Sequence, residues 1–418
     1  MPFPRMMRVK QHFDAPTVDD IPAAIRAEIA KLGLSGKVRP GQTVAIAVGS
    51  RGIYQIALII KTVVEEMKAL GARPFAVPAM GSHGGGTAEG QRGIIESYGV
   101  TEEYIGAPIR SSMEVVQVDQ TEDGVPVYFD QHAYGADHVV VVGRIKPHTG
   151  FVGEIESGLH KMMLIGLGKH KGAILYHQAI VHYSFDRIIR SVGQSVIEKC
   201  RILFGLALVE NPYDRTALVR AVPPARFVEE EKELLLLARK WMPRLPFDLV
   251  DLLVIDAIGK DISGSGLDTN VVGRKYNSHE ALEKEYPKVT RIVVRDLTPA
   301  THGNAAGIGI ADFCHQRVLD QIDVDATNIN CITGNSPSGA QIPIHYDTDA
   351  RVIATALTTV GLVEDVKAKV VRIHDTLHVE EVMISEAYLP EVEKRDDLEI
   401  LSPLADMAFD ARGDLLPF

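Results

Sequence analysis

Apolar and polar positions alternate in regular blocks along the first half of the chain. Short apolar runs bounded by polar or glycine-rich stretches predict buried strands at residues 43–48, 73–78, 138–142 and 201–209. Amphipathic segments between them predict helices at residues 20–32, 53–70 and 87–98. Strands that alternate with helices in this way are typical of a parallel sheet covered by helices. In such sheets the loops that leave the carboxyl ends of the strands form the ligand-binding crevice.

The same pattern restarts in the second half of the chain. A charged, leucine-rich segment at 228–241 is interpreted as a helical connector, and apolar runs at 249–256 and 291–297 predict the strands of a second sheet. We therefore predict an α/β protein with two domains, each a mostly parallel sheet covered by helices, and an active-site cleft between them. The predicted divisions are a catalytic and cofactor-binding domain at 1–245, a second domain at 246–390, and a tail at 391–418 that packs back on the connector.

Length, charge and cysteine content narrow the class of protein. The chain has 418 residues, 46% of them hydrophobic, which is enough for two cores. A formal net charge of −11 argues against a nucleic-acid partner, because phosphate backbones are bound by clustered lysine and arginine. The three cysteines are widely spaced, which excludes a disulfide scaffold. Because no long apolar segment and no signal-like N-terminus is evident, we expect a cytoplasmic protein without a membrane partner.

The strand predicted at 138–142 leads into an unusual concentration of polar side chains. Over residues 143–177 these side chains are His148, Glu154, Glu156, His160, Lys161, Lys169, His170, Lys171 and His177. A neutral imidazole near pH 7 removes protons or binds metals, so the run suits acid–base chemistry or a metal site. The alternative for each histidine is a hydrogen-bonded structural side chain, and the two glutamates are bases, partners that orient histidines, or charges at a helix start. The spacing is not of the His-Glu-x-x-His type and does not name a metal.

Two earlier loops occupy corresponding places after strands. Ser50-Arg51-Gly52 follows the strand at 43–48, where a guanidinium suits bidentate capture of a carboxylate. Gly81 to Thr87 follows the strand at 73–78, where backbone amides and a helix N-terminus suit an anion with His83 beside it. The alternatives are a surface arginine paired with an acid, and a tight turn in which Thr87 caps the helix.

A further loop of this kind lies in the second domain. Residues 263–275 contain Asp268, Asn270, Arg274 and Lys275, which either close over a substrate or are solvated loop charges.

Taken together, these segments resemble the nickel-pincer-dependent lactate racemase family of 2-hydroxyacid racemases and epimerases. The family's Thr-Arg-Pro, Gly-Thr-His and Pro-His-x-x-x-Gly motifs are similar, in that order, to residues 50–52, to residues 81–83, and to Pro147-His148 running on to Lys161. Its Ser-Gly-Gly-x-Pro-Leu-Asp-x-Asn-Val segment resembles residues 263–271. The resemblance covers most of the chain.

The resemblance implies a nickel-pincer nucleotide, which is derived from nicotinic acid, is joined to a lysine through a thioamide, and has its nickel bound by a histidine. Lys161 corresponds to the attachment residue. His177 corresponds best to the nickel ligand, with His170 as the second choice. Enzymes that make and insert the cofactor are the partners this implies.

The resemblance also assigns the remaining site residues. His83 and His148 correspond to the acid and base on opposite faces of the substrate carbon, and Arg51 to the arginine near the substrate carboxylate. Ser50, Arg51 and Lys275 are expected among the cofactor-binding residues. The implied activity is inversion of C2 of a 2-hydroxyacid by reversible hydride transfer.

Several positions depart from the family pattern. Val48 stands where the family has an acid, Gly52 replaces a proline, and the segment from His148 to Lys161 is longer. These changes predict a substrate larger or more polar than lactate, such as a sugar acid. Two other functions remain open: a hydrolase or dehydratase with a simple divalent metal on His148, His170 or His177, and a binding protein that captures a carboxylate without chemistry.

Overall fold

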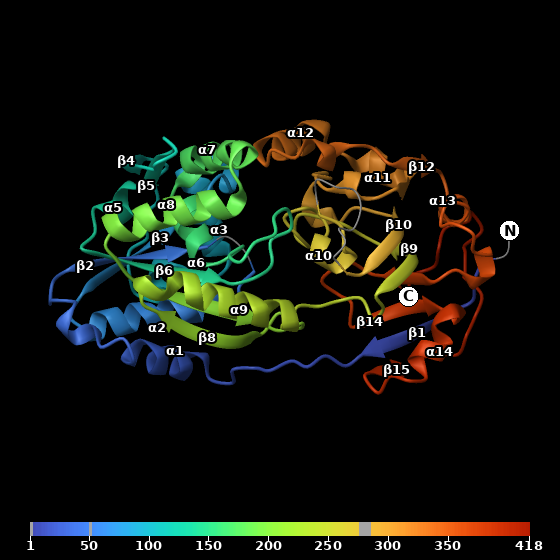
Figure 1. Cartoon of the computed structure of the whole chain (residues 1–418), viewed down its shortest axis with the longest axis horizontal. Coiled ribbons are helices and arrows are strands. Elements are labelled where there is room, and N and C mark those ends of the chain that lie inside the picture. Colours follow the sequence, from blue (N-terminus) through green and yellow to red (C-terminus); the bar gives the residue numbers. More distant parts are fainter. Residues whose placement is uncertain (1–2, 50–51, 276–285) are drawn as a thin grey trace. The chain divides into compact units, whose positions relative to one another are not determined.

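The computed structural model describes residues 3–49, 52–275 and 286–418, which form two compact units. The first unit comprises residues 15–242, and the second combines residues 1–14 with residues 243–418. Each unit has the predicted α/β fold, with a sheet that is mostly parallel and is covered by helices (Figure 1). The cysteines are buried and unlinked. Among the described residues, the helices are all too short or too polar to cross a bilayer.

The first unit is built on a central sheet with the strand order β3-β2-β6-β7-β8, in which only the β7–β8 pair is antiparallel. The strands of this unit are β2 (Thr43–Val48), β3 (Arg73–Pro78), β4 (Val115–Gln120), β5 (Pro126–Asp130), β6 (His138–Arg144), β7 (Ile202–Glu210) and β8 (Thr216–Val222). Its helices are α1 (Ile21–Ala30), α2 (Ile56–Ala69), α3 (Ala88–Ser97), α4 (Glu102–Ile105), α5 (Gln131–Tyr134), α6 (Leu159–Lys161), α7 (Lys169–His182), α8 (Phe185–Lys199) and α9 (Phe227–Trp241).

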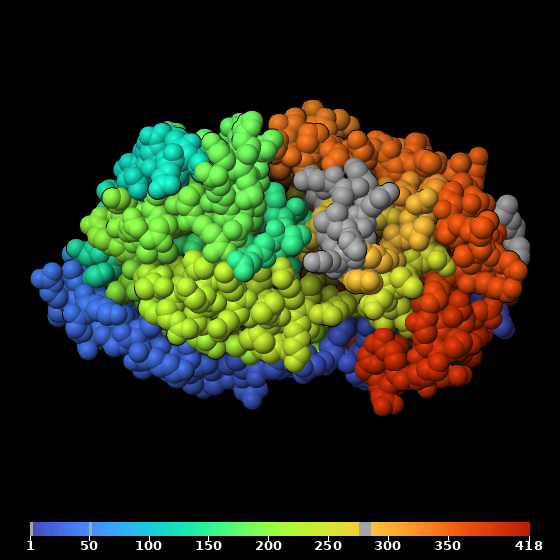
Figure 2. Space-filling model, viewed as in Figure 1, coloured from blue at the N-terminus to red at the C-terminus, as the bar shows by residue number. Residues whose placement is uncertain are grey.

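Alternation along the central strands explains why both faces of this sheet carry helices. In β2, Ala45 and Ala47 belong to one apolar core, and Val44, Ile46 and Val48 belong to the other. The first core includes apolar side chains of α7, α8 and α9, and the second those of α1, α2 and α3. Figure 2 shows the surface that α7, α8 and α9 form over this unit. A strand buried on both faces reads as a continuous apolar run, which is why the sequence located these strands closely.

The second unit contains a mixed sheet, called here the C-terminal sheet, with the order β12-β11-β10-β9-β13-β14-β1-β15. Its pairs are parallel from β12 to β13 and antiparallel from β13 to β15. The strands are β1 (Met6–Gln11), β9 (Leu249–Ile255), β10 (Lys288–Val294), β11 (Phe313–His315), β12 (Ile344–Tyr346), β13 (Val370–Ile373), β14 (Glu381–Ser385) and β15 (Leu398–Ile400). The helices are α10 (Thr269–Val272), α11 (Gln316–Gln321), α12 (Val324–Thr333), α13 (Asp349–Leu357) and α14 (Leu389–Val392).

The structure divides the chain differently from the expected 1–245, 246–390 and 391–418. The segment at 228–241 is no free connector, because it lies in α9 and packs its apolar residues into the core of the first unit. Strand β1 belongs to the second unit, where it pairs with β14 and β15. The expected tail also belongs to that unit: β15 extends its sheet, and the amide of Leu415 donates to Asp349 Oδ2 (2.9 Å).

Candidate functional site

Three loops of the first unit leave the carboxyl edge of neighbouring strands. Because β2 lies between β3 and β6, the loops that follow these strands emerge side by side. Residues Ser50 and Arg51 lie outside the described part of the chain. The segment next to them is held by Arg144 at the end of β6, whose guanidinium donates to the carbonyl of Gly52 (3.0 Å) and pairs with Glu210.

The glycine-rich loop after β3 carries His83 at the start of a short turn before α3. Thr87 caps α3 through a hydrogen bond from the amide of Gly90 (3.1 Å), as the structural alternative for this loop predicted. Buried Gln91 holds the other side of the loop, because its Nε2 donates to the carbonyls of Gly81 (2.8 Å) and His83 (3.3 Å). The loop is therefore fixed by α3, and His83 is half-buried at its tip.

Behind this loop lies Lys169, a fully buried lysine whose role the sequence did not single out. Its Nζ donates to the carbonyl of Pro78 and to Gln91 Oε1 (3.1 Å), and lies 3.3 Å from Asp130 Oδ2. Burial lowers the pKa of Lys169, while the charge of Asp130 opposes that shift. Through these three contacts Lys169 connects the end of β3, helix α3 and the end of β5, next to the loop that carries His83. The only sequence signal was a lysine among glycines.

His148, in the loop after β6, is oriented by backbone and carboxylate groups. Its Nδ1 accepts hydrogen bonds from the amides of Gly150 (3.0 Å) and Phe151 (3.2 Å), so the neutral ring carries its proton on Nε2. Buried Glu156 accepts from the amides of His148 (2.5 Å) and Gly153 (3.0 Å) and pairs with Arg239 (2.7 Å). Of the three roles expected for Glu156, the structure supports that of a partner that orients a histidine.

Lys161 lies at the end of α6 and is followed by one turn of π-helix, Met162–Gly166. This turn packs closely against the glycine loop and strand β6: a Cβ placed on Gly81 would lie 3.0 Å from Ile165 Cγ2, and one on Gly143 would lie 3.1 Å from Met162 Cγ. π-helical turns are rare and occur frequently at functional sites. The turn therefore brings Lys161 to the same edge of the central sheet as His83.

A small apolar hollow lies beside Lys161. Its lining includes Lys161, Ile165 and Phe185. The ring of Phe185 stacks on Phe151 with centroids 4.7 Å apart, and its centroid is 5.7 Å from that of His148. Ile165 also contacts the glycine loop, so the segment after Lys161 and the start of α8 form a common support for the predicted residues.

His177 lies in the next helix, α7, and one of its ring nitrogens is placed as in a metal-binding histidine. Its Nδ1 donates to the carbonyl of Ala173 (2.7 Å), which leaves the Nε2 lone pair for another partner. Burial lowers the pKa of His177, and the nearby positive charge of Lys161 lowers it further against the opposing bond to Ala173. The positive charge of Lys161 thus favours a neutral imidazole at His177.

The other histidines of the polar run are placed differently. His160 is buried and its Nδ1 pairs with Glu231, as the structural alternative predicted. His170 is exposed and lies against Gly86 of the glycine loop, where its ring reaches within 3.4 Å of a Cβ placed on that glycine. In the described ranges, no grouping of three metal-ligating side chains includes His148, His170 or His177. A simple divalent metal shared by these three residues therefore has no preformed site there.

The two cationic residues of the loop at 263–275 in the second unit have different surroundings. Arg274 is buried and is bound by Asp312 (2.9 Å) and the carbonyls of Val289 and Thr290, so it is a structural residue. Lys275 instead pairs with Asn270, and Asn270 Nδ2 donates to Asp268 Oδ1 (3.0 Å). Lys275 thus remains the candidate cation of this loop.

Comparisons with known proteins relate this geometry to a family. Residues 6–187 match the model of the lactate racemase N-terminal domain. The comparison with curated proteins gives no match. The chain is similar in structure to the lactate racemase apoprotein from Thermoanaerobacterium thermosaccharolyticum, with a TM-score of 0.52 and 12% identity over 88% of this chain and 94% of that one. A protein from Thermotoga maritima has a TM-score of 0.49 and 11% identity over 77% of this chain and 83% of that one.

The two kinds of match support different statements. At 12% identity, the structural likeness shows a shared fold. The family match spans the positions of His83, His148, Lys161 and His177, whereas Lys275 lies beyond it. Over residues 6–187, this chain is therefore similar to the N-terminal domain of lactate racemases.

Proposed function

We propose that the chain is a racemase or epimerase that inverts C2 of a 2-hydroxyacid and uses a nickel-pincer nucleotide joined to Lys161. The family match supports a racemase in general. The observation that carries the finer proposal is that the charge of Lys161 acts on the buried imidazole of His177 and helps to lower its pKa, while the Nδ1 of His177 binds the carbonyl of Ala173 and its Nε2 is left for another ligand.

The residues around Lys161 fit such a cofactor. The amine lies at the end of α6, where its Nζ donates to Ser157 Oγ (3.2 Å), and its neighbours in the hollow are mostly apolar. His177 Nε2 supplies one nitrogen ligand of the kind that nickel accepts. His170, the second choice, is exposed and makes no such pairing with Lys161 in the described structure.

The two remaining histidines, His148 and His83, are proposed to have different roles in proton transfer. His148, as oriented by Gly150 and Phe151, presents Nε2–H and therefore donates a hydrogen bond to a substrate oxygen. It takes up a proton on Nδ1 only when those two amides turn away. His83, held at the loop tip by Gln91, is accordingly our candidate for the base that first removes the hydroxyl proton.

This chemistry avoids a poorly stabilised carbanion beside a carboxylate. When bound, the cofactor would supply a reversible hydride acceptor for C2, so that the alcohol could pass through a planar keto acid. The chain binds the carboxylate, orients the hydroxyl group between two histidines and excludes water from the planar intermediate. Arg51 is proposed for the carboxylate, and Ser50, Arg51 and Lys275 for cofactor binding. We propose a substrate larger or more polar than lactate, on the sequence departures named above.

Intact-mass and nickel analysis of the chain purified from its native host tests this proposal. We expect a covalent adduct of nucleotide size that maps to Lys161 and is accompanied by nickel. Lys161→Arg should lose the adduct, and the exposed Lys171→Arg should retain it. Loss of nickel but not of the adduct in His177→Ala would assign the ligand. An unmodified Lys161 in protein from the native host would overturn the proposal, whatever the zinc content of the chain.

A further inference from the structure

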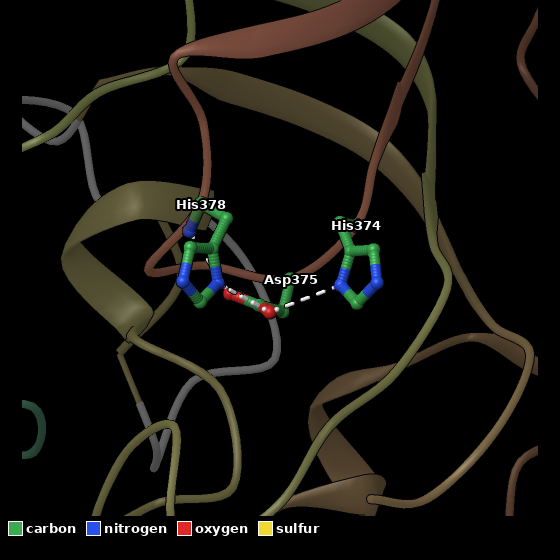
Figure 3. Close-up of side chains that lie close together, drawn as sticks. All are labelled: His374, Asp375 and His378. Atoms are coloured by element: carbon green, nitrogen blue, oxygen red, sulfur yellow. Dashed lines mark hydrogen bonds and ion pairs between the residues drawn. The ribbon is translucent and has the colours of Figure 1, made fainter. Parts of the chain in front are cut away.

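A second group of imidazoles lies outside the site described above, in the turn that follows β13. His374, Asp375 and His378 place one ligand atom each within 4.8 Å of the others. Figure 3 shows the two histidine rings on either side of the Asp375 carboxylate, both directed toward it. Because β13 is parallel to β9, this turn leaves the carboxyl edge of the parallel part of the C-terminal sheet, where open α/β sheets bind ligands.

The carboxylate of Asp375 is held in place by its own turn. Its Oδ1 accepts hydrogen bonds from the amides of Leu377 (2.7 Å) and His378 (2.9 Å), and its side chain is 5% exposed. The neighbouring Thr376 hydroxyl accepts from the amide of Asp268 (2.8 Å), which fixes the turn to a second loop. One oxygen of Asp375 is thus used for structure, and the other, Oδ2, faces the two imidazoles.

Both imidazoles approach that same oxygen with the same ring nitrogen. His374 Nδ1 lies 3.1 Å and His378 Nδ1 2.8 Å from Asp375 Oδ2. Without a metal, each of these contacts requires a proton on Nδ1, so two donors share one acceptor. Separations of about 3 Å between ligand atoms are also those expected around a divalent ion with bonds near 2.0–2.2 Å. The outer faces of the histidines are open to water, at 65% and 74% exposure of the side chains.

We propose that His374, Asp375 and His378 form a binding site for a divalent transition-metal ion of the zinc class. Two imidazole nitrogens and one carboxylate oxygen are ligands that zinc favours, and the exposed side leaves at least one position for water or an exchangeable ligand. The ion replaces the Nδ1 protons and balances the charge of Asp375. The site is in the second unit and does not depend on the nucleotide proposed for Lys161.

The other group of this kind in the described residues has a different character. His315, Asp349 and Asp414 also lie close together, but Arg295 and Arg317 already neutralise their carboxylates. A cation there would meet two guanidinium groups. Among the charged side chains that the structure describes, the recorded ion pairs of Asp375 are only those with the two histidines.

Zinc titration of the full-length, tag-free chain tests the site. The protein is produced in a host that lacks the cofactor pathway, treated with a chelator and titrated with ZnCl₂ by calorimetry. We expect one zinc ion per chain with micromolar or tighter affinity. His374→Ala/His378→Ala should weaken binding by at least about tenfold, and Asp375→Asn should weaken it in the same direction.

The control is His12→Ala/His345→Ala, which removes two other exposed imidazoles of the same unit and should bind zinc like the wild type. Because His374 and His378 are exposed, their variants should keep the circular dichroism spectrum of the wild type. Unchanged zinc affinity in the folded His374→Ala/His378→Ala variant, or no uptake by the wild type at tens of micromolar zinc, would overturn the proposal. Neither result bears on the adduct at Lys161.

Discussion

Glu154 and Glu156 are two residues apart and have opposite surroundings. The Glu154 side chain is 65% exposed and meets Arg190 (2.9 Å) and Lys232 (2.7 Å) in solvent. Glu156 is 2% exposed and binds two loop amides as well as Arg239. Surface ion pairs of the first kind contribute little to stability, whereas a buried acceptor that loses its charge leaves its donors unpaired.

Glu156→Gln should therefore loosen the loop that carries His148. The amide cannot accept from both backbone amides and Arg239 as the carboxylate does, so we expect a loss of about 1–3 kcal/mol in the free energy of unfolding. Urea unfolding of the cofactor-free chain measures this loss, and racemisation by the loaded enzyme should fall as well. Glu154→Gln is the control and should unfold like the wild type. Equal behaviour of the two variants would contradict the role given to Glu156.

Gln91 has a similar position beneath His83. Gln91→Met keeps the length of the side chain but removes two donors to the glycine loop and one acceptor for Lys169. We expect a loss of about 1–3 kcal/mol in unfolding free energy and reduced turnover. Gln194→Met, at an exposed position of α8, is the matched control. Wild-type stability and turnover in Gln91→Met would show that the loop is held by other contacts.

The positions of candidate site residues were predictable where a loop directly follows an apolar strand. His83 and His148 were named by such positions and Lys161 by the family resemblance; the structure places the two histidines in loops after neighbouring strands and Lys161 at the end of α6, and the catalytic roles of all three stay predictions. Lys169 and Gln91 were not predictable, because the partners of Lys169 lie between 39 and 91 residues away, and Gln91 binds Lys169 and two backbone carbonyls. Arg51 stays a prediction, since its position lies outside the described residues.

Secondary-structure elements were predicted best where burial determines them. The strand at 43–48 and the strand at 73–78 have the predicted bounds, because both are apolar and buried after their first residue. Strand β1 was missed, since its sequence Met-Met-Arg-Val-Lys-Gln has charged residues on its less buried side and its partners lie at the other end of the chain. The π-helical turn after Lys161 also has no sequence signature, because it results from packing against β6 and the glycine loop.

The glycine loop after β3 provides a test at the level of an element. Gly84 and Gly85 both have φ near +66°, but a Cβ on Gly84 would lie 2.5 Å from the backbone of Gly90, whereas one on Gly85 would meet nothing within 4 Å. Gly85→Ala should therefore cost only the left-handed strain, about 1–2 kcal/mol. Gly84→Ala should cost about 1–3 kcal/mol more, because the loop must move away from α3. Urea unfolding compares the two variants, and equal losses would contradict the close packing.

At the level of the whole molecule, the second unit is built from both ends of the chain, residues 1–14 and 243–418. The sequence pattern predicted that a second α/β unit begins near residue 245, and the structure places that boundary at Pro243. It did not predict that residues 1–14 belong to the second unit. Chain order favours pairing between neighbours, so a strand that pairs across more than 370 residues leaves no local signal.

Deletion of residues 1–14 should destabilise one unit and spare the other. Strand β1 pairs with both β14 and β15 and buries Met6, Met7 and Val9, so its loss exposes strand edges and apolar surface in the second unit. Hydrogen–deuterium exchange of the shortened chain should show faster exchange at 381–385 and 398–400. The amides of β2, β3 and β6 should keep their protection and serve as the internal control. Faster exchange in the central sheet, or unchanged exchange in β14, would contradict the assignment of β1 to the second unit, because local opening follows the contacts that a segment has lost.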